Sequence, residues 1–344
     1  MKKPQFGWLS LKAGALSALL ALSCNGGDFD AQTKITGVRV LTSKADKSYA
    51  KPGETVNLEL LVADGRKDKT NAINVLWIPV PCVNPSNDLY YLCFTSGTSA
   101  AGGASSGGSG GSTNPIANLR PGQDLTDFLP KGPTFSFKMP ENIIQTRKGS
   151  DPYGLVIVFN VACAGRLVLK EVDPNSGPQQ IPLECTDVFG KALPPSEYVI
   201  GFTRVYAYND RSNNNPVLEG VTFDGVKVDL VKGITVDRCL EKKERDCPEH
   251  KFDTIVPASS QEVNVGEKQP NGQFYKEQVW AAYYSTDGKF DGDGRLLYDA
   301  TSGKVDDTTI KFYAPKEPGT KQAWVVVKDN RGGANWLQFP ITVR

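Results

Sequence analysis

The chain has 344 residues, a length that predicts two domains at the usual domain size of roughly 150 residues. It carries 39 Lys and Arg against 38 Asp and Glu, a formal net charge of +1, which excludes the basic footprint of a nucleic-acid binder. Its single histidine excludes a multi-histidine metal site, and we expect neither a metal nor a cofactor. The 34 glycines and 23 prolines favour many turns and short strands.

Residues 1–23 have the pattern of an export signal. Lys2, Lys3 and Lys12 precede an apolar run from Ala13 to Leu22. This run is too short to span a bilayer. The triplet Ala21-Leu22-Ser23 before Cys24 resembles the lipobox of bacterial lipoproteins, although Leu usually stands where Ala21 does. The resemblance implies that Cys24 becomes the lipidated first residue of the mature chain. The alternative is ordinary cleavage that leaves Cys24 a free thiol, and both alternatives export the protein.

The cysteine count supports a lipid on Cys24. Seven cysteines leave one over in an exported chain, and lipidation accounts for it. The other six fall into three sequence-local pairs, and an oxidising compartment makes disulfides the expected state. We therefore predict Cys82–Cys93, Cys163–Cys185 and Cys239–Cys247. No C-x-x-C spacing occurs, so a zinc site is not expected.

After a polar tether over residues 24–33, the body of the chain predicts strands. Alternating or compact apolar segments recur and are separated by turn residues. The segment from Thr95 to Asn114 is almost wholly Gly, Ser, Ala and Thr, and predicts a disordered loop inside a domain. The expected strands include, in chain order, Ile35–Val40, Val56–Leu60, Val75–Ile78, Phe135–Lys138, Leu155–Val161, Tyr198–Tyr208, Val217–Val226 and Val279–Tyr284.

The later half of the chain echoes the earlier half. Three features recur in the same order: a strand with a tryptophan, a Phe-x-x-Pro segment and a long apolar run. The matched pairs are Val75-Leu76-Trp77 with Gln278-Val279-Trp280, Phe137–Pro140 with Phe312–Pro315, and the run from Leu155 with the run from Trp324.

The segment from Tyr313 to Val343 resembles the last strands of an immunoglobulin-like or PKD-type domain. Trp77 and Trp280 match the buried tryptophan of the third strand in such sandwiches. The whole chain resembles the two-domain Ig-like lipoproteins that some Gram-negative bacteria, myxobacteria especially, encode. The resemblance implies an all-β fold of two immunoglobulin-like β-sandwich domains after a lipoprotein signal peptide. We expect them over 34–212, enlarged by the 95–114 loop and a Cys163–Cys185 insertion, and over 213–344.

Two polar segments have residues that occur in chemical sites. The run Asp287–Arg295 looks like a calcium loop, but both EF-hand registers fail, so we expect a glycine-rich hairpin, with a loose calcium site near Asp291 as the alternative. His250 lies in the charged stretch Asp237–Asp253, for which we predict a solvated loop. No nucleophile-elbow, P-loop or H-E-x-x-H motif occurs, so no catalytic residue is expected.

Three aromatic residues are the candidate partner-binding residues. Tyr90, Tyr91 and Phe94 lie in or beside the Cys82–Cys93 loop and could stack on a sugar or anchor a protein. The alternative is that they cap the core. We therefore expect a non-enzymatic lipoprotein of the cell envelope, held at the outer membrane by its lipid, that presents loops to a protein or glycan partner. The alternatives are an envelope hydrolase with an unconventional site and an accessory subunit of a secretion or surface assembly.

Overall fold

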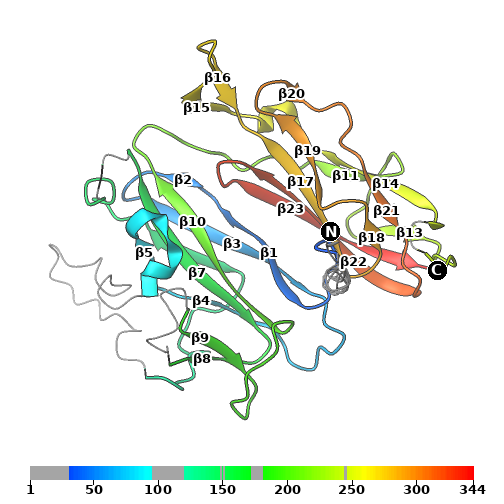
Figure 1. Ribbon diagram of the computed structural model, residues 1–344, viewed down its shortest axis with the longest axis horizontal. Helices are drawn as coiled ribbons and strands as arrows, with labels where there is room; N and C mark the ends of the chain where they lie inside the picture. The colour runs from blue at the N-terminus through cyan, green and yellow to red at the C-terminus, as the bar shows by residue number, and fades with distance from the viewer. Residues whose placement is uncertain (1–30, 95–119, 148, 150–151, 172–180, 244–245) are drawn as a thin grey trace, which may run out of the picture. The chain divides into compact units, whose positions relative to one another are not determined.

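The computed structural model describes residues 31–94, 120–147, 149, 152–171, 181–243 and 246–344 (Figure 1). These residues form an all-β sandwich fold whose helical segments are short 3-10 turns, which confirms the predicted fold class. The signal peptide, Cys24 and the 95–114 loop lie outside the described residues, as does all of the tether except residues 31–33. Among the described residues, no helix has the length and apolar character needed to cross a membrane.

Two sheets enclose the first core, and we call them the N-terminal sheet pair. Their facing sides bury Val56 and Leu58 of one sheet against Val156, Val158 and Val205 of the other. Strict alternation along Val56–Leu60 explains why one face of that strand is buried. One sheet has the order β1 (Val38–Ala45), β3 (Thr55–Asp64), β6 (Thr134–Lys138); the other has β2 (Tyr49–Ala50), β10 (Tyr198–Ala207), β7 (Gly154–Cys163), β4 (Asn74–Trp77), with β5 (Cys82–Val83) also on β7.

Two further sheets form the C-terminal sheet pair. Its core packs the rings of Phe252, Tyr283, Phe312 and Phe339. One sheet has the order β12 (Val226–Lys227), β11 (Gly220–Phe223), β14 (Glu249–Ile255), β21 (Ile310–Tyr313), β18 (Lys289–Phe290). The other has β13 (Ile234–Val236), β23 (Ala334–Val343), β22 (Gly319–Asp329), β17 (Val279–Ser285), β19 (Gly294–Asp299), β20 (Gly303–Lys304).

The two sheet pairs repeat one strand order. In the first, β2-β10-β7-β4 faces β1-β3-β6; in the second, β13-β23-β22-β17 faces β11-β14-β21. Both β2–β10 and β13–β23 are parallel pairs in otherwise antiparallel sheets. The three echoes in the sequence fall on corresponding strands: β4 and β17, β6 and β21, β7 and β22. Residues 32–344 nevertheless form one compact unit, so the division at 212/213 stays a prediction.

Three disulfides brace the loops. Cys82–Cys93 ties β5 to the 3-10 turn η2 (Tyr90–Phe94), which follows η1 (Ser86–Asp88). Cys163–Cys185 ties β7 to a hairpin of β8 (Arg166–Leu169) and β9 (Leu183–Thr186), and Cys239–Cys247 closes a loop before β14. These are the pairs that the sequence predicts, and they place the protein outside the cytoplasm. The remaining elements are η4 (Ala258–Ser260) and the hairpin of β15 (Val263–Lys268) and β16 (Phe274–Lys276).

Two expectations about the C-terminal half need correction. Trp280 is half-buried and takes no place in the core, whereas Trp77 is fully buried as predicted. The solvated loop predicted over Asp237–Asp253 ends early, because Glu249–Ile255 forms β14. Phe252 and Thr254 of that strand point inward while charged residues alternate with them, so a charged sequence conceals a half-buried strand.

Candidate functional site

The aromatic residues predicted as a partner site pack largely against the N-terminal sheet pair. The Tyr90 ring stacks on Phe202 with centroids 4.7 Å apart, and Phe94 meets Phe159 edge-on at 4.6 Å. Tyr91 is half-buried and contacts the edge of Tyr90. Tyr90 and Phe94 therefore contribute to core packing, which was the alternative for these rings.

The polar segments hold ion pairs. Asp291 accepts hydrogen bonds from Arg295 at 2.7 Å and from the Lys311 amide at 3.0 Å, so its Oδ1 is occupied. His250 Nδ1 lies 2.8 Å from Asp224 and its ring stacks on Phe223. Within the described part of the chain, no group of His, Cys, Asp and Glu is arranged to hold a metal ion.

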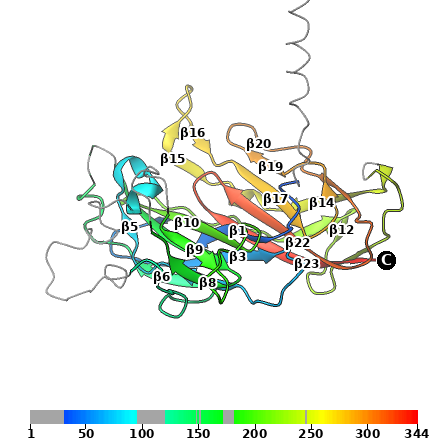
Figure 2. The same ribbon diagram turned by 60° about the horizontal axis from the view of Figure 1, so that its bottom comes forward.

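A group of polar side chains lies where the two sheet pairs meet. Figures 1 and 2 both place β1 between β10 and β23, and β1 contacts both strands. An apolar cluster fills this seam, with Leu41 and Leu61 from the first pair and Trp324 and Val326 from the second. A pocket lies beside this cluster.

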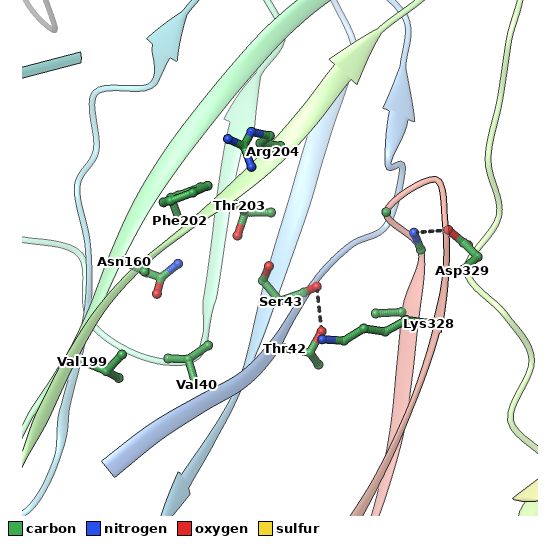
Figure 3. Close-up of a pocket in the computed structure, with 14 residues that line it drawn as sticks. Val40, Thr42, Ser43, Asn160, Val199, Phe202, Thr203, Arg204, Lys328 and Asp329 are labelled. Carbon is green, nitrogen blue, oxygen red and sulfur yellow. Dashed lines mark hydrogen bonds between the residues drawn. The ribbon is translucent and has the colours of Figure 1, made fainter. Parts of the chain in front are cut away.

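The pocket has a volume of about 410 Å³ and is lined by β1, β7, β10 and the turn between β22 and β23. In Figure 3, Lys328 reaches in from β22 toward Thr42, while Asn160 and Thr203 lie on the opposite side. β1 and β10 border an open side of the first sandwich here, since β2 pairs with β10 only at Tyr206 and Ala207.

Asn160 brings a polar side chain to the inner face of β7. The residue is 1% exposed, and its Oδ1 has no hydrogen-bond partner among the described residues. Gly201 stands directly opposite on β10, where an added Cβ would lie 2.9 Å from that oxygen. Glycine at this position therefore makes room for the Asn160 amide itself.

Thr203 lies two residues further along β10 and shares this face. It is 6% exposed, and its Oγ1 likewise has no partner in the described part of the chain. A buried polar atom without a partner costs free energy, and most such atoms in folded proteins are satisfied by protein, water or ligand. Both residues line the same cavity.

A bulge in β1 shapes the opposite wall. Val40 pairs with Val62 and Thr42 with Leu61, so Leu41 is the extra residue on β1. Its side chain enters the seam cluster, and its carbonyl accepts a hydrogen bond from Lys328 Nζ at 3.3 Å. The bulge residue Leu41 thus contacts the apolar cluster through its side chain and Lys328 through its carbonyl oxygen.

Lys328 is the cation that reaches into the pocket. Lys328 forms no ion pair with any described residue, and burial lowers the pKa of its ammonium group. Arg204 is exposed, and its guanidinium lies 4.8 Å from the centre of the Phe202 ring, on the other face of β10 from Thr203. The lining contains one carboxylate, that of Asp329.

The Asp329 carboxylate is already occupied by the turn that it stabilises. It accepts hydrogen bonds from the backbone amides of Arg331 at 2.7 Å and Gly333 at 2.8 Å. Asn213, from the segment that joins the two sheet pairs, donates to it at 3.2 Å. Burial raises the pKa of Asp329 above its ordinary value. The carboxylate thus fixes the pocket wall and has little capacity left for a ligand.

Sequence reasoning missed every side chain of this pocket. One signal was present: Asn160 is a polar residue inside the apolar run from Leu155 to Cys163, whose residues are all buried. A glycine in the middle of β10, Gly201, was a second signal, since such a glycine often marks a close approach of another group. Nothing in the sequence shows that these two residues face Lys328.

No protein-family model matches this chain, and no curated protein does. Among solved structures it is similar to dimeric latent PorU from Porphyromonas gingivalis, at 11% identity and a TM-score of 0.20, over 90% of this chain and 24% of that one. It is also similar to three N-terminal domains of the highly immunogenic outer capsid protein of bacteriophage RB49, at 8% identity and a TM-score of 0.17, over 89% and 99% of the two chains. The chain therefore spans about a quarter of PorU. TM-scores this low define neither its fold nor its function.

Proposed function

We propose that this protein is a non-enzymatic binding module of the cell envelope that holds a small polar ligand in the seam pocket. The observation that carries the proposal is the pair of buried, unpartnered oxygens of Asn160 and Thr203 at one cavity. Small-molecule sites are concave and contain a few convergent polar groups, and a volume of about 410 Å³ falls within their usual range. Most of the pocket wall comes from strands, which hold polar groups more rigidly than loops do.

The location that goes with this function is the outer membrane, through a lipid on Cys24. The lipobox-like triplet before Cys24 and the pairing of the other six cysteines support it. Labelled palmitate should be incorporated into the wild-type protein and not into Cys24→Ser. A wild-type protein without label would refute the anchor and leave the pocket proposal untouched.

The binding proposal is tested with two matched hydroxyl deletions. Thr203→Val removes a hydroxyl from the pocket, whereas Ser285→Ala removes a buried, unpartnered hydroxyl that does not line it. We expect ligand-observed NMR with a library of small polar compounds to find binders whose affinity falls about tenfold in Thr203→Val. The same compounds should bind Ser285→Ala as they bind wild type. A library in which no binder responds to Thr203→Val would contradict the proposal.

A further inference from the structure

We propose that the ligand of the seam pocket is a small hydroxylated carboxylate of about monosaccharide size, such as a sugar acid. The inference rests on the binding function proposed above and goes on to name the chemical class of the ligand. Three properties of the lining carry it: an unpaired cation, an amide oxygen that requires a neutral donor, and the volume.

The cation is Lys328. Its Nζ donates one hydrogen bond, to the Leu41 carbonyl at 3.3 Å, and an ammonium group has three N–H donors. The described chain offers no carboxylate within ion-pair distance, unlike Lys321 on the same strand, which pairs with Asp287 at 3.4 Å. A half-buried ammonium without a counter-ion is unfavourable, and an anion in the pocket would offset that cost.

The opposite wall requires a hydrogen-bond donor on the same ligand. Asn160 Oδ1 can only accept, while the Thr203 hydroxyl can donate or accept. An ammonium group on the ligand is disfavoured as that donor, because Lys328 would repel it. The one carboxylate in the lining, on Asp329, is already engaged by Asn213 and two backbone amides. A hydroxyl group supplies the donor without the charge.

The volume sets the size of the ligand. A cavity of about 410 Å³ corresponds to about fourteen waters at about 30 Å³ each. A ligand with about that number of non-hydrogen atoms fits, which is the size of a single sugar ring with a carboxylate. A hydroxylated ring could then present its carboxylate to Lys328 and its hydroxyls to Asn160 and Thr203 on the other side (Figure 3).

Sugars that share one ring but differ in charge separate the contribution of the carboxylate to binding from that of the hydroxyl groups. The purified protein is titrated calorimetrically with galacturonate, galactose and galactosamine, and with the corresponding glucose series. We expect at least one acid to bind about tenfold or more tightly than its neutral and amino counterparts, because charge-assisted hydrogen bonds are about twice as strong as neutral ones. Propionate, a carboxylate without hydroxyls, should bind more weakly than that acid.

Two lysine variants test the assignment to Lys328. Lys328→Met should weaken the acid about tenfold or more and leave the neutral sugar unchanged, while Lys321→Met, with the same charge change on the same strand, should bind the acid as wild type does. A neutral or amino sugar that binds as tightly as the acid and responds to Thr203→Val would overturn this inference and leave the proposed binding function standing. If neither this series nor the wider library yields a binder sensitive to Thr203→Val, both proposals fail.

Discussion

Arg331 lies in the turn between β22 and β23, and its guanidinium group pairs with two glutamates. Its Nε donates to Glu277, which is 0% exposed, and its Nη2 lies 2.8 Å from Glu262. The second Glu277 oxygen accepts from the Glu262 amide at 3.1 Å. Burial is the largest cause that raises the pKa of Glu277, to about 6, and Asp329 nearby adds to it, against the lowering effect of Arg331.

This raised pKa predicts a pH dependence of stability. Between about pH 4.5 and 6 the folded protein keeps a proton on Glu277 that the unfolded chain has released. The contribution is therefore fully present below pH 4.5 and is lost as the pH rises through 6, a change of about 2 kcal/mol in the free energy of unfolding.

Glu277→Gln removes this loss because glutamine does not titrate. Urea unfolding at pH 4 and pH 7.5 should show the variant gaining about 2 kcal/mol relative to wild type between the two values. A difference between the two proteins that stays constant with pH would show that Glu277 ionises in the fold as it does in water.

The rings of Tyr90 and Phe94 predict a second effect at the level of single residues. Both pack on the core, so Tyr90→Ala and Phe94→Ala should each destabilise the fold, by roughly 1–3 kcal/mol for rings that are only partly buried. Tyr91→Ala should cost less, because its one ring contact is with the edge of Tyr90. Thermal melts of the three variants check this order. If Tyr90→Ala melts like wild type, its ring is free to meet a partner.

Among the elements, the segment between β10 and β11 joins the sheet pairs through asparagine side chains. Asn215 Nδ2 donates to the Ala45 carbonyl at 2.8 Å, at the end of β1. Its Oδ1 accepts from the Ala334 amide at 2.9 Å, at the start of β23. One side-chain amide thus bridges two strands, β1 and β23, that belong to different sheet pairs.

Loss of that bridge should be visible at a single amide. In Asn215→Ala the Ala334 amide loses its acceptor. Its hydrogen exchange should become about tenfold faster, which corresponds to the free energy of roughly one to two hydrogen bonds. Asn214→Ala is the matched control, because Asn214 contacts Glu262 instead. Exchange at Ala334 that is equally fast in both variants would mean that the bridge contributes nothing of its own.

Sequence patterns predicted elements better than they predicted the site. The alternation of Val56–Leu60, the apolar run from Leu155 and the short cysteine spacings are local, and each led to the observed strand or disulfide. β14 was missed because its outward residues are charged. The pocket depends on long-range register: Gly201 faces Asn160 across the β7–β10 pairing, and Lys328 comes from the other sheet pair.

The internal repeat has different residue types at equivalent positions of β7 and β22. Aligning the run from Leu155 with the run from Trp324 sets Asn160 against Asp329 and Phe159 against Lys328. Phe159 packs under η2, whereas Lys328, at the equivalent position, faces β1 of the other sheet pair. One strand position therefore serves core packing in one copy and the pocket in the other.

At the scale of the whole molecule, the seam should decide whether the chain unfolds as one body. Trp324 is the largest side chain of the seam cluster and is buried, together with Leu41, Leu61 and Val326. Each sheet pair has its own core, so the cluster is the main apolar link between them. We expect wild type to show a single calorimetric transition, with equal calorimetric and van't Hoff enthalpies.

Trp324→Ala should split that transition in two. Truncating a buried tryptophan typically costs about 3–5 kcal/mol, and here much of that loss falls on the contact between the sheet pairs. Val327→Ala is the control, since Val327 lies on the same strand but faces the core of the C-terminal sheet pair. It should lower the melting temperature and keep one transition. A single transition in Trp324→Ala, with its two enthalpies still equal, would show that the asparagine bridge and the pocket walls couple the sheet pairs without the apolar cluster.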